Sequence, residues 1–352
     1  MNIIHALRTE KDGTYNTEFD HQDSLCIIDH GLGFNKDLKC ALLEDLHNQT
    51  LHRRVVATEY IFNQRIRKLY PKFDFVFDVN AWYQENGIEN LQSFEYSPKK
   101  DLNVFACSFN NNPHIGRKLL TCALHYYGFF NPETCSKTFT LNPYEVIGTL
   151  YDCVGDRADW YKKFFDGKQL ADFYQTRYVF GPMVSKDHSR NQQHLKSKID
   201  RSFLHIVSET MPTSYYPFVT EKFLYSVVQK GLFVAYAQPA WHQHVSYYYG
   251  FRRYTKIFNY DFDSIQNPVK RLISLLDMIA KFSKLSPKDW QDLYEVEKET
   301  IEYNFEHFVS GNYLKHLEKR VSKTGAIAPF HEKVQAKIKF DKMFQLIEQT
   351  AS

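Results

Sequence analysis

Residues 202–245, SFLHIVSETMPTSYYPFVTEKFLYSVVQKGLFVAYAQPAWHQHV, decide the fold of this chain. Two apolar runs in this stretch, SFLHIV and LFVAYA, have the length and the β-branched and aromatic content of buried strands. Between them, residues 223–228 have helical spacing, and Gly231 is of the type that usually follows a helix end. A strand, a polar loop, a helix and a second strand make a βαβ crossover, so the sequence predicts an α/β fold with a parallel sheet.

Polar side chains gather where such a sheet binds its ligand. Residues 208–210 (SET) follow the carboxyl end of the first strand, and residues 220–222 (TEK) open the helix. Ligands of open α/β sheets bind outside the carboxyl ends of the strands, and a helix N-terminus beside a lysine suits phosphate oxygens. A glutamate nearby can accept hydrogen bonds from both hydroxyls of a ribose. The sequence therefore predicts a nucleotide site, although Glu221 and Lys222 are also typical of a plain, solvated helix cap.

The same stretch carries a resemblance to a known family. FVTEK, a helix and then LFVAYAQP are similar to the signature of family 10 glycosyltransferases, the α-1,3-fucosyltransferases. Their pattern is F-x-x-x-x-E-N, a loop, Y-V-T-E-K, a helix and I-P-I-Y-W-G-x-P. Glu209 falls on the E of E-N, residues 219–222 fall on V-T-E-K, and Pro239 falls on the closing proline. The resemblance implies that Glu209 and residues 220–222 bind the nucleotide diphosphate of a sugar donor.

Three positions depart from the family pattern. Thr210 replaces the Asn, Phe218 replaces the Tyr, and Ala237 replaces the Gly. We keep Phe218 and Thr220 as donor-binding candidates, and the departures leave the identity of the sugar open.

A second segment, residues 103–131 (NVFACSFNNNPHIGRKLLTCALHYYGFFN), resembles the family as well. It predicts a strand, a polar loop and a helix, where the family has a strand leading to S-N, a short loop, an arginine and a helix. Arg117 falls on that arginine, and an arginine at a helix start is well placed to bond a pyrophosphate through two N–H groups. Ser108 and Asn111 are further donor-binding candidates in this segment. The alternative is that Arg117 is a surface arginine of the first helical turn.

The resemblance implies a GT-B-like fold, in which two Rossmann-like lobes enclose a cleft. We expect an N-terminal acceptor-side α/β lobe over residues 1–100, a C-terminal nucleotide-sugar-binding α/β lobe over 101–310 and a helical tail over 311–352, with SPKKDLN as the linker. Further expectations are strands in SLCII, RRVVATEYIF, FDFVF and YTKIFNY (254–260), a solvated loop over 185–201, and helices over 267–282 and from Ser286.

The implied activity is transfer of a sugar from a nucleotide-diphosphate sugar, with a GDP-sugar favoured, to an acceptor hydroxyl of a glycan. An inverting transfer needs a carboxylate or histidine that takes the hydroxyl proton, and the candidates are Asp29, His30, Glu59 and Asp78. Asp29 and His30 are favoured because they end the first expected strand. Cations and helix N-termini then stabilise the leaving diphosphate, so we expect no metal and no cofactor beyond the sugar donor.

Composition bears on other classes of protein. The 352 residues carry a net charge of +3, which neither indicates nor excludes a nucleic-acid binder. The six cysteines form no C-x-x-C pair, so neither a zinc site nor a disulfide framework is indicated. A reducing compartment is expected, namely a bacterial cytoplasm or, for a viral protein, the cytoplasm of the host. No signal sequence and no run of about 18 apolar residues occurs, so we expect no membrane span.

His242-x-His244 lacks a third metal ligand with suitable spacing, and Asp261-x-Asp263 is typical of a helix cap.

Two alternatives remain open. The acceptor can instead be a hydroxymethylated base flipped out of duplex DNA, as for phage-type DNA glycosyltransferases. Its phosphates would then contact HRRVVATEYIFNQRIRKLYPK (52–72) and SRNQQHLKSKIDR (189–201). The chain can also be a non-catalytic nucleotide-sugar-binding module, which the departures at residues 210, 218 and 237 favour.

Overall fold

The computed structural model describes residues 3–5, 25–28, 32–49, 51, 53–77, 88–92, 100–142, 172–180 and 188–323. The chain forms two compact units. One comprises Met1–His30, Lys39–Glu85 and Leu314–Ser352, and the other comprises Gly31–Leu38 and Asn86–Tyr313. Each unit contains its own four-stranded sheet, and every strand pair in the two sheets is parallel, so the α/β fold expected from the sequence is confirmed.

The first unit is built on strands β1 (Ile3–His5), β2 (Leu25–Ile28), β3 (Arg54–Thr58) and β4 (Phe73–Phe77), in the order β1-β2-β3-β4. They confirm the strands expected in SLCII, RRVVATEYIF and FDFVF. Helices α1 (Ala41–Gln49) and α2 (Gln64–Leu69) lie between them in the chain. Asn63 begins α2 because its side-chain oxygen accepts hydrogen bonds from the N–H groups of Arg65 and Ile66, at 3.0 and 3.1 Å. Ile66 is buried in the core of this unit.

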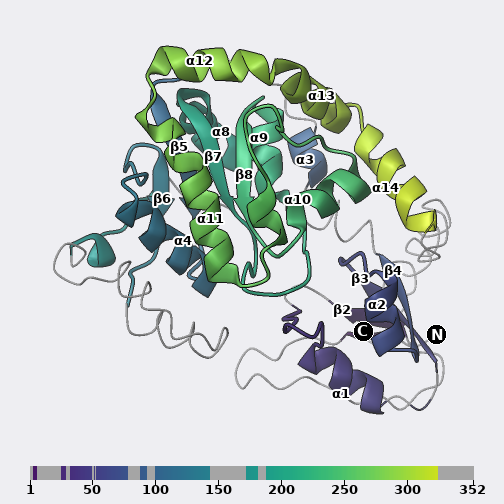
Figure 1. The fold of residues 1–352 in the computed structure, drawn as a ribbon. Coiled ribbons are helices and arrows are strands. Elements are labelled where there is room, and N and C mark those ends of the chain that lie inside the picture. The colour runs from purple at the N-terminus through teal and green to yellow at the C-terminus, as the bar shows by residue number, and fades with distance from the viewer. Residues whose placement is uncertain are drawn as a thin grey trace, which may run out of the picture. The chain divides into compact units, whose positions relative to one another are not determined.

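The second unit is built on strands β5 (Val104–Asn110), β6 (Cys135–Lys137), β7 (Ser202–Ser208) and β8 (Leu232–Tyr236), in the order β6-β5-β7-β8. From β5 the chain moves outward to β6, whereas from β7 it moves outward to β8 on the other side (Figure 1). The strand order therefore reverses between β5 and β7. In open α/β sheets the carboxyl edge at such a switch point is the usual ligand site.

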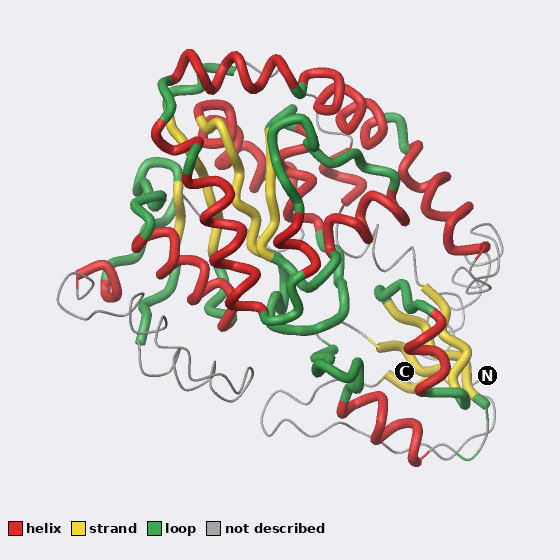
Figure 2. Tube along the Cα trace, in the orientation of Figure 1, coloured by secondary structure: helices red, strands yellow, loops and turns green. Residues whose placement is uncertain are grey.

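Helices cover both faces of this sheet (Figure 2). α4 (Ile115–Tyr126) connects β5 to β6, and the helical run of η2 (Glu221–Phe223) and α9 (Leu224–Val228) connects β7 to β8. Because these two connections leave the central strand pair in opposite directions, they cover opposite faces. α11 (Pro268–Ala280) lies on the α4 side, where Tyr127 Oη donates to Asp277 Oδ1 at 2.7 Å. α3 (Ile88–Gln92) and α8 (His188–Arg201) pack with α9 on the other face.

The remaining elements follow β8 in the chain. They are α10 (Trp241–His244), the π-helical turn η3 (Val245–Tyr249), the short turns η4 (Asp261–Ser264) and η5 (Phe282–Lys284), and helices α12 (Pro287–Val296), α13 (Lys298–Val309) and α14 (Asn312–Lys323). Asn267 caps α11, and Ser286 forms a capping box with Asp289 at the start of α12. The helices expected over 267–282 and from Ser286 are thus confirmed.

Two expectations for the second unit are wrong. Residues 188–201, within the expected solvated loop, form helix α8, because Gln192, Leu195 and Ile199 recur at helical spacing and bury one face among otherwise polar residues. Residues 254–260 form no strand. Their backbone is tied by side chains instead: the N–H of Tyr254 donates to Tyr260 Oη at 3.3 Å, and both rings are buried.

A buried lysine fixes the segment 172–180 against β6. Lys137 is 0% exposed, and its ammonium donates to the carbonyl oxygens of Phe139, Tyr174 and Thr176 at 3.0, 3.4 and 2.5 Å. It also lies 5.0 Å from the centre of the Phe173 ring. Burial lowers the pKa of Lys137 to about 8. This charge is therefore held by carbonyl dipoles and an aromatic face, both of which stabilise an ammonium ion less well than water does.

Candidate functional site

The polar residues that follow β7 are organised around one buried carboxylate. Glu209 is 0% exposed, and its Oε2 accepts hydrogen bonds from the N–H of Thr210 at 3.1 Å and from the hydroxyl of Thr220 at 2.5 Å. Its Oε1 accepts from the N–H of Thr220 at 3.3 Å. Burial raises the pKa of Glu209, against the opposing effect of Lys222 and the Thr220 hydrogen bonds. Glu209 thus joins the two ends of the loop 209–220, and both of its oxygens are engaged within that loop.

Lys222 lies directly beside this carboxylate, in the first turn of the helical run. Its ammonium donates to the hydroxyls of Thr210 and Thr220 at 3.0 and 2.9 Å and lies 3.5 Å from Glu221 Oε1. Burial by itself would raise the pKa of Glu221, but Lys222, followed by His188, lowers it below its usual range. The side chains of Lys222 and Glu221 remain 20% and 21% exposed, so both are partly accessible to solvent.

Arg117 reaches the same edge from the first turn of α4. The residue is 5% exposed, and its Nε is buried without a hydrogen-bond partner among the residues that the structure describes. Burial lowers the pKa of Arg117, while the nearby carboxylates of Glu221 and Glu209 oppose that shift. A buried guanidinium N–H group without a partner is costly, so an anion that completes its hydrogen bonds is favoured here. We name Arg117, Glu209, Thr220, Glu221 and Lys222 the edge cluster.

Gly116 allows α4 to approach the loop so closely. A Cβ on Gly116 would lie 2.0 Å from Pro212 Cγ and 2.5 Å from Pro212 Cδ, far inside van der Waals contact. The loop is itself sharply turned at this point, where Met211 has a left-handed backbone with φ of 56°. The absence of a side chain on Gly116 is therefore what brings the start of α4, and Arg117 with it, against the loop.

Two side chains that the sequence analysis did not single out hold the loop in place. Arg271 of α11 is 1% exposed; its Nη2 donates to the carbonyl oxygen of Pro212 at 2.7 Å and its Nε to that of Ala237 at 2.8 Å. Gln238 donates from Nε2 to the carbonyl oxygen of Thr210 at 2.6 Å. The loops that follow β7 and β8 are thus bonded to common side chains. No local motif marks such residues, because their partners lie far away in the chain.

Helix N-termini converge on the edge cluster. His114 is the N-cap residue of α4, where its side chain makes no capping bond. His188 begins α8, is buried, and places its Nδ1 2.6 Å from the hydroxyl of Tyr225. Both imidazoles act electrostatically on the cluster, His114 beside Arg117 and Lys222, and His188 beside Glu221. The partial positive charges of the helix N-termini add to those of the two cations.

Two strand ends contribute buried polar atoms at the same edge. Asn110 ends β5 and Ser208 ends β7, and neither Asn110 Oδ1 nor Ser208 Oγ has a hydrogen-bond partner among the described residues. Ser208 belongs to the SET triplet that follows the first predicted strand, whereas Asn110 is not among the expected site residues. The signal available was their position, since each is the last residue of a buried strand at the switch point.

The other expected donor-binding residues are placed differently. Ser108 lies inside β5 at 0% exposure, where its hydroxyl donates to the carbonyl oxygen of Ile206 at 2.8 Å and accepts from Asn110 Nδ2 at 3.1 Å. Asn111 is half-buried, and its carbonyl oxygen accepts a hydrogen bond from the hydroxyl of Thr138. Phe218 is buried, and its carbonyl oxygen accepts from Trp241 Nε1 at 3.0 Å. Ser108 and Phe218 thus support the edge from within the fold, whereas Asn111 directly follows the carboxyl end of β5.

Of the proposed bases, only Glu59 can be placed. It follows β3 in the first unit and is 6% exposed. Asp29, His30 and Asp78 lie outside the described residues.

His242 and Asp263 form a structural pair. His242 Nε2 accepts a hydrogen bond from the N–H of Ala235 at 3.0 Å, so the ring proton is on Nδ1, which lies 2.7 Å from Asp263 Oδ1. Asp263 also accepts from the N–H of Gln243 at 3.2 Å and so caps α10, which precedes it in the chain. The expected cap of the following helix is wrong, because Asn267 caps α11 instead. Both ring nitrogens of His242 are occupied. Among the described residues no group of three or more His, Cys, Asp or Glu is placed to hold a metal ion.

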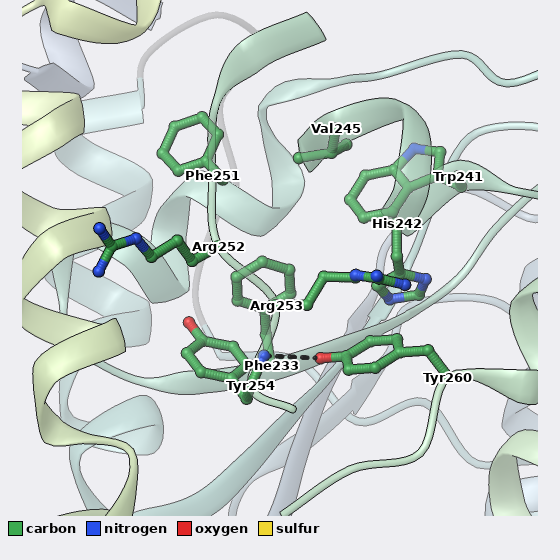
Figure 3. A pocket seen from close by; sticks show the side chains of 9 residues that line it. All are labelled: Phe233, Trp241, His242, Val245, Phe251, Arg252, Arg253, Tyr254 and Tyr260. Carbon is green, nitrogen blue, oxygen red and sulfur yellow. Dashed lines mark hydrogen bonds between the residues drawn. The ribbon is translucent and has the colours of Figure 1, made fainter. Parts of the chain in front are cut away.

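A small cavity lies beside this pair but apart from the edge cluster. Figure 3 shows its lining, which includes Phe233, Trp241 and Tyr254, with Arg252 extending away from the other side chains. No member of the edge cluster lines it.

In the part of the chain that the structure describes, no helix has the length and apolar character needed to cross a membrane. Comparison with known protein families, with curated proteins and with solved structures gave no match to this chain.

Proposed function

We propose that this protein is a glycosyltransferase that moves a sugar from a nucleotide-diphosphate sugar, with a GDP-sugar favoured, to an acceptor hydroxyl. The observation that carries the proposal is Arg117, a buried arginine whose Nε has no partner among the described residues, at the carboxyl edge that Lys222 also faces. A diphosphate supplies the missing acceptor oxygens and the charge that offsets burial of the guanidinium.

The edge cluster supports a division of roles. Arg117 and Lys222 bind the diphosphate oxygens, and Glu221, whose Oε1 lies 3.5 Å from the Lys222 ammonium, accepts bonds from the ribose hydroxyls. Glu209 has both oxygens engaged within its loop, so it positions Thr220 and Lys222 for the ligand. Charge on the leaving diphosphate grows in the transition state, and fixed cations and helix N-termini stabilise it without requiring a metal ion.

The resemblance to family 10 glycosyltransferases extends the proposal to the whole chain. The two compact units would then be the two lobes of a GT-B-like enzyme, with the first presenting the acceptor and the second holding the donor. An inverting transfer takes its base from Asp29, His30, Glu59 or Asp78 of the first unit. Glycans are the favoured acceptors.

A panel of ligands tests the donor site. GDP, UDP, ADP and inorganic pyrophosphate are each added to the full chain and the melting temperature is measured, because a ligand that binds only the folded state raises it. We expect selective stabilisation by one nucleoside diphosphate and weaker stabilisation by pyrophosphate. Arg117→Ala should lower the affinity for both by roughly ten- to hundredfold, the loss expected for one or two charged hydrogen bonds, and should leave binding of the free nucleoside unchanged.

The matched control is Arg252→Ala, since Arg252 is exposed and lies 3.7 Å over the ring of Tyr303, outside the edge cluster. It should bind every ligand as the unmodified chain does. If no nucleoside diphosphate stabilises the protein, the donor site is refuted. Binding without turnover of any nucleotide sugar would favour a non-catalytic binding module instead.

One observation favours duplex DNA as a second candidate acceptor. The basic stretch 189–201 belongs to α8, which begins at the edge cluster and exposes Arg190 and Lys196 along its outer face. Contacts between such residues and phosphates release counterions, so binding to duplex DNA should weaken steeply with added salt. Binding of a 20-base-pair duplex at several salt concentrations separates a DNA acceptor from a glycan.

A further inference from the structure

We propose that His114 is a diphosphate-binding residue that becomes protonated when the ligand binds, so that binding to the edge cluster takes up a proton from solution. This inference rests on the proposed function, because it assigns a role to one more residue of the same site. The ligand class is a diphosphate, free or within a nucleotide.

The position of His114 brings its imidazole to the cations of the edge cluster. His114 is the N-cap residue of α4, and Arg117 follows three residues later in the first turn of that helix. The charges of Arg117 and Lys222 both act on the imidazole of His114. Its backbone is fixed, because its N–H donates to the carbonyl oxygen of Asn112 at 2.9 Å and its carbonyl oxygen accepts from the N–H of Arg117 at 2.9 Å. Its side chain is exposed and makes no capping bond, so it is available to a ligand.

Burial and charge both disfavour protonation of the imidazole before a ligand binds. Partial burial and then the two neighbouring cations, Arg117 on α4 and Lys222 on the helical run, lower the pKa of His114. Two carboxylates, Glu209 after β7 and Glu221 beside Lys222, also belong to the edge cluster, and each is itself close to Lys222. Without ligand, a third positive charge at this point is repelled by the first two.

A bound diphosphate reverses the sign of the local charge. Its oxygens carry two or more negative charges among the two cations and the helix N-terminus, so the protonated imidazole is then attracted and can donate to a phosphate oxygen. The pKa of His114 therefore rises on binding. By linkage, affinity for the diphosphate should increase as the pH falls through the pKa of His114 in the complex, relative to a variant that lacks this imidazole. The comparison removes the titration of the diphosphate itself, which both proteins share.

A second polar group near His114 can bind the same ligand. Arg117 is 5% exposed and has a buried Nε without a partner among the described residues, and it lies one helical turn from His114. The other imidazole near the edge cluster, that of His188, is 5% exposed and is bonded to Tyr225. His114 is the one of these two whose side chain is open to a ligand.

Calorimetric titration of the full chain tests the proposal. Pyrophosphate and GDP are titrated at pH 7.0 in buffers of different ionisation enthalpy, and the difference in heat gives the number of protons taken up. We expect uptake of a substantial fraction of one proton. His114→Asn should abolish most of that uptake and weaken pyrophosphate by about tenfold at pH 6.5, the effect of one pKa unit, with little effect at pH 8.5. His194→Asn, on α8, is the matched control and should behave as the unmodified chain.

Each outcome separates the two proposals. If neither ligand binds the unmodified chain, the proposed function fails and this inference fails with it. If both bind but His114→Asn takes up as many protons as the unmodified chain, His114 is not the protonated group and only this inference is overturned. If His114→Asn does not fold, the NMR titration of His114 in the unmodified chain replaces it; pyrophosphate should raise its pKa by about one unit or more, and an unchanged pKa refutes the role.

Discussion

Replacing Gly116 by alanine should push α4 away from the loop 209–220. The added Cβ would meet Pro212 Cγ at 2.0 Å, whereas real Cβ contacts are not found below 3.0 Å, so the two segments must separate by about 1 Å. Pro212 cannot yield easily, because its side chain is a closed ring and its carbonyl oxygen is bonded to Arg271 Nη2 at 2.7 Å. Alanine stabilises a helix by about 0.5–1 kcal/mol relative to glycine, whereas overpacking costs about 1–3 kcal/mol. We expect a net loss of about 1–2 kcal/mol in the free energy of unfolding.

Ligand binding should suffer more than stability. Arg117 follows Gly116 directly, so a displacement of about 1 Å in the start of α4 moves its guanidinium out of hydrogen-bond geometry with a bound diphosphate. We expect the affinity for pyrophosphate to fall about tenfold or more, the loss of one charged hydrogen bond. Urea unfolding gives the change in stability, and calorimetry gives the change in affinity.

Gly33→Ala is the matched control for this substitution. A Cβ on Gly33 would lie 3.6 Å from Met211 Cε, an ordinary contact, so the free energy of unfolding should change by less than about 0.5 kcal/mol. If Gly116→Ala is as stable as the unmodified chain and binds pyrophosphate equally well, α4 does not depend on close contact with Pro212. That result would refute the role of Gly116 in positioning Arg117.

Three further predictions concern single groups. Lys137 has a folded-state pKa of about 8, below the usual 10.4. Between pH 8 and about 10.5 the unfolded chain therefore binds more protons than the folded chain. The free energy of unfolding should rise with pH in that range by about 3 kcal/mol. Urea unfolding of Lys137→Met should lack this rise, and an equal rise in both proteins would contradict the buried charge. Asp263→Asn removes the charged partner of His242 Nδ1–H and should lower the free energy of unfolding by about 1–3 kcal/mol. An unchanged melting temperature would contradict this expectation. Glu221→Gln should weaken GDP by about 1–3 kcal/mol, because the charged ribose contact is lost. Calorimetry should show no weakening of pyrophosphate, because the variant loses only a carboxylate that competes with phosphate for Lys222; equal losses for both ligands would place Glu221 at the phosphates.

The sequence predicts the strands and crossovers well because β5, β7 and β8 are nearly continuous apolar runs that only a buried strand accommodates. The sequence does not predict α8, because the buried face of this helix combines only two apolar residues, Leu195 and Ile199, with polar residues that are buried as well. It also predicts a strand at 254–260 that does not form. Aromatic residues are typical both of strands and of buried segments that pack beside a sheet, so composition cannot separate the two.

At the site, the sequence predicts which residue types gather but not how their hydrogen bonds are used. Glu209 and Arg117 both match a motif, yet Glu209 has both oxygens engaged in its own loop, whereas Arg117 has a buried N–H group without a partner among the described residues. That difference depends on partners from other parts of the chain, such as the Pro212 loop that packs against Gly116. Local pattern carries no information about such partners.

The hydrogen bonds of Arg271 have a consequence for motion. Its guanidinium joins the carbonyl oxygens of Pro212, Ala237 and Gln266, which belong to three separate connections of the second unit. Burial lowers the pKa of Arg271 only to about 10, so the guanidinium stays charged and these bonds persist at neutral pH. Any movement of this one side chain would therefore loosen all three connections together. Their amide hydrogens should therefore exchange with solvent in a single cooperative event, and a ligand that orders one connection should slow exchange in all three.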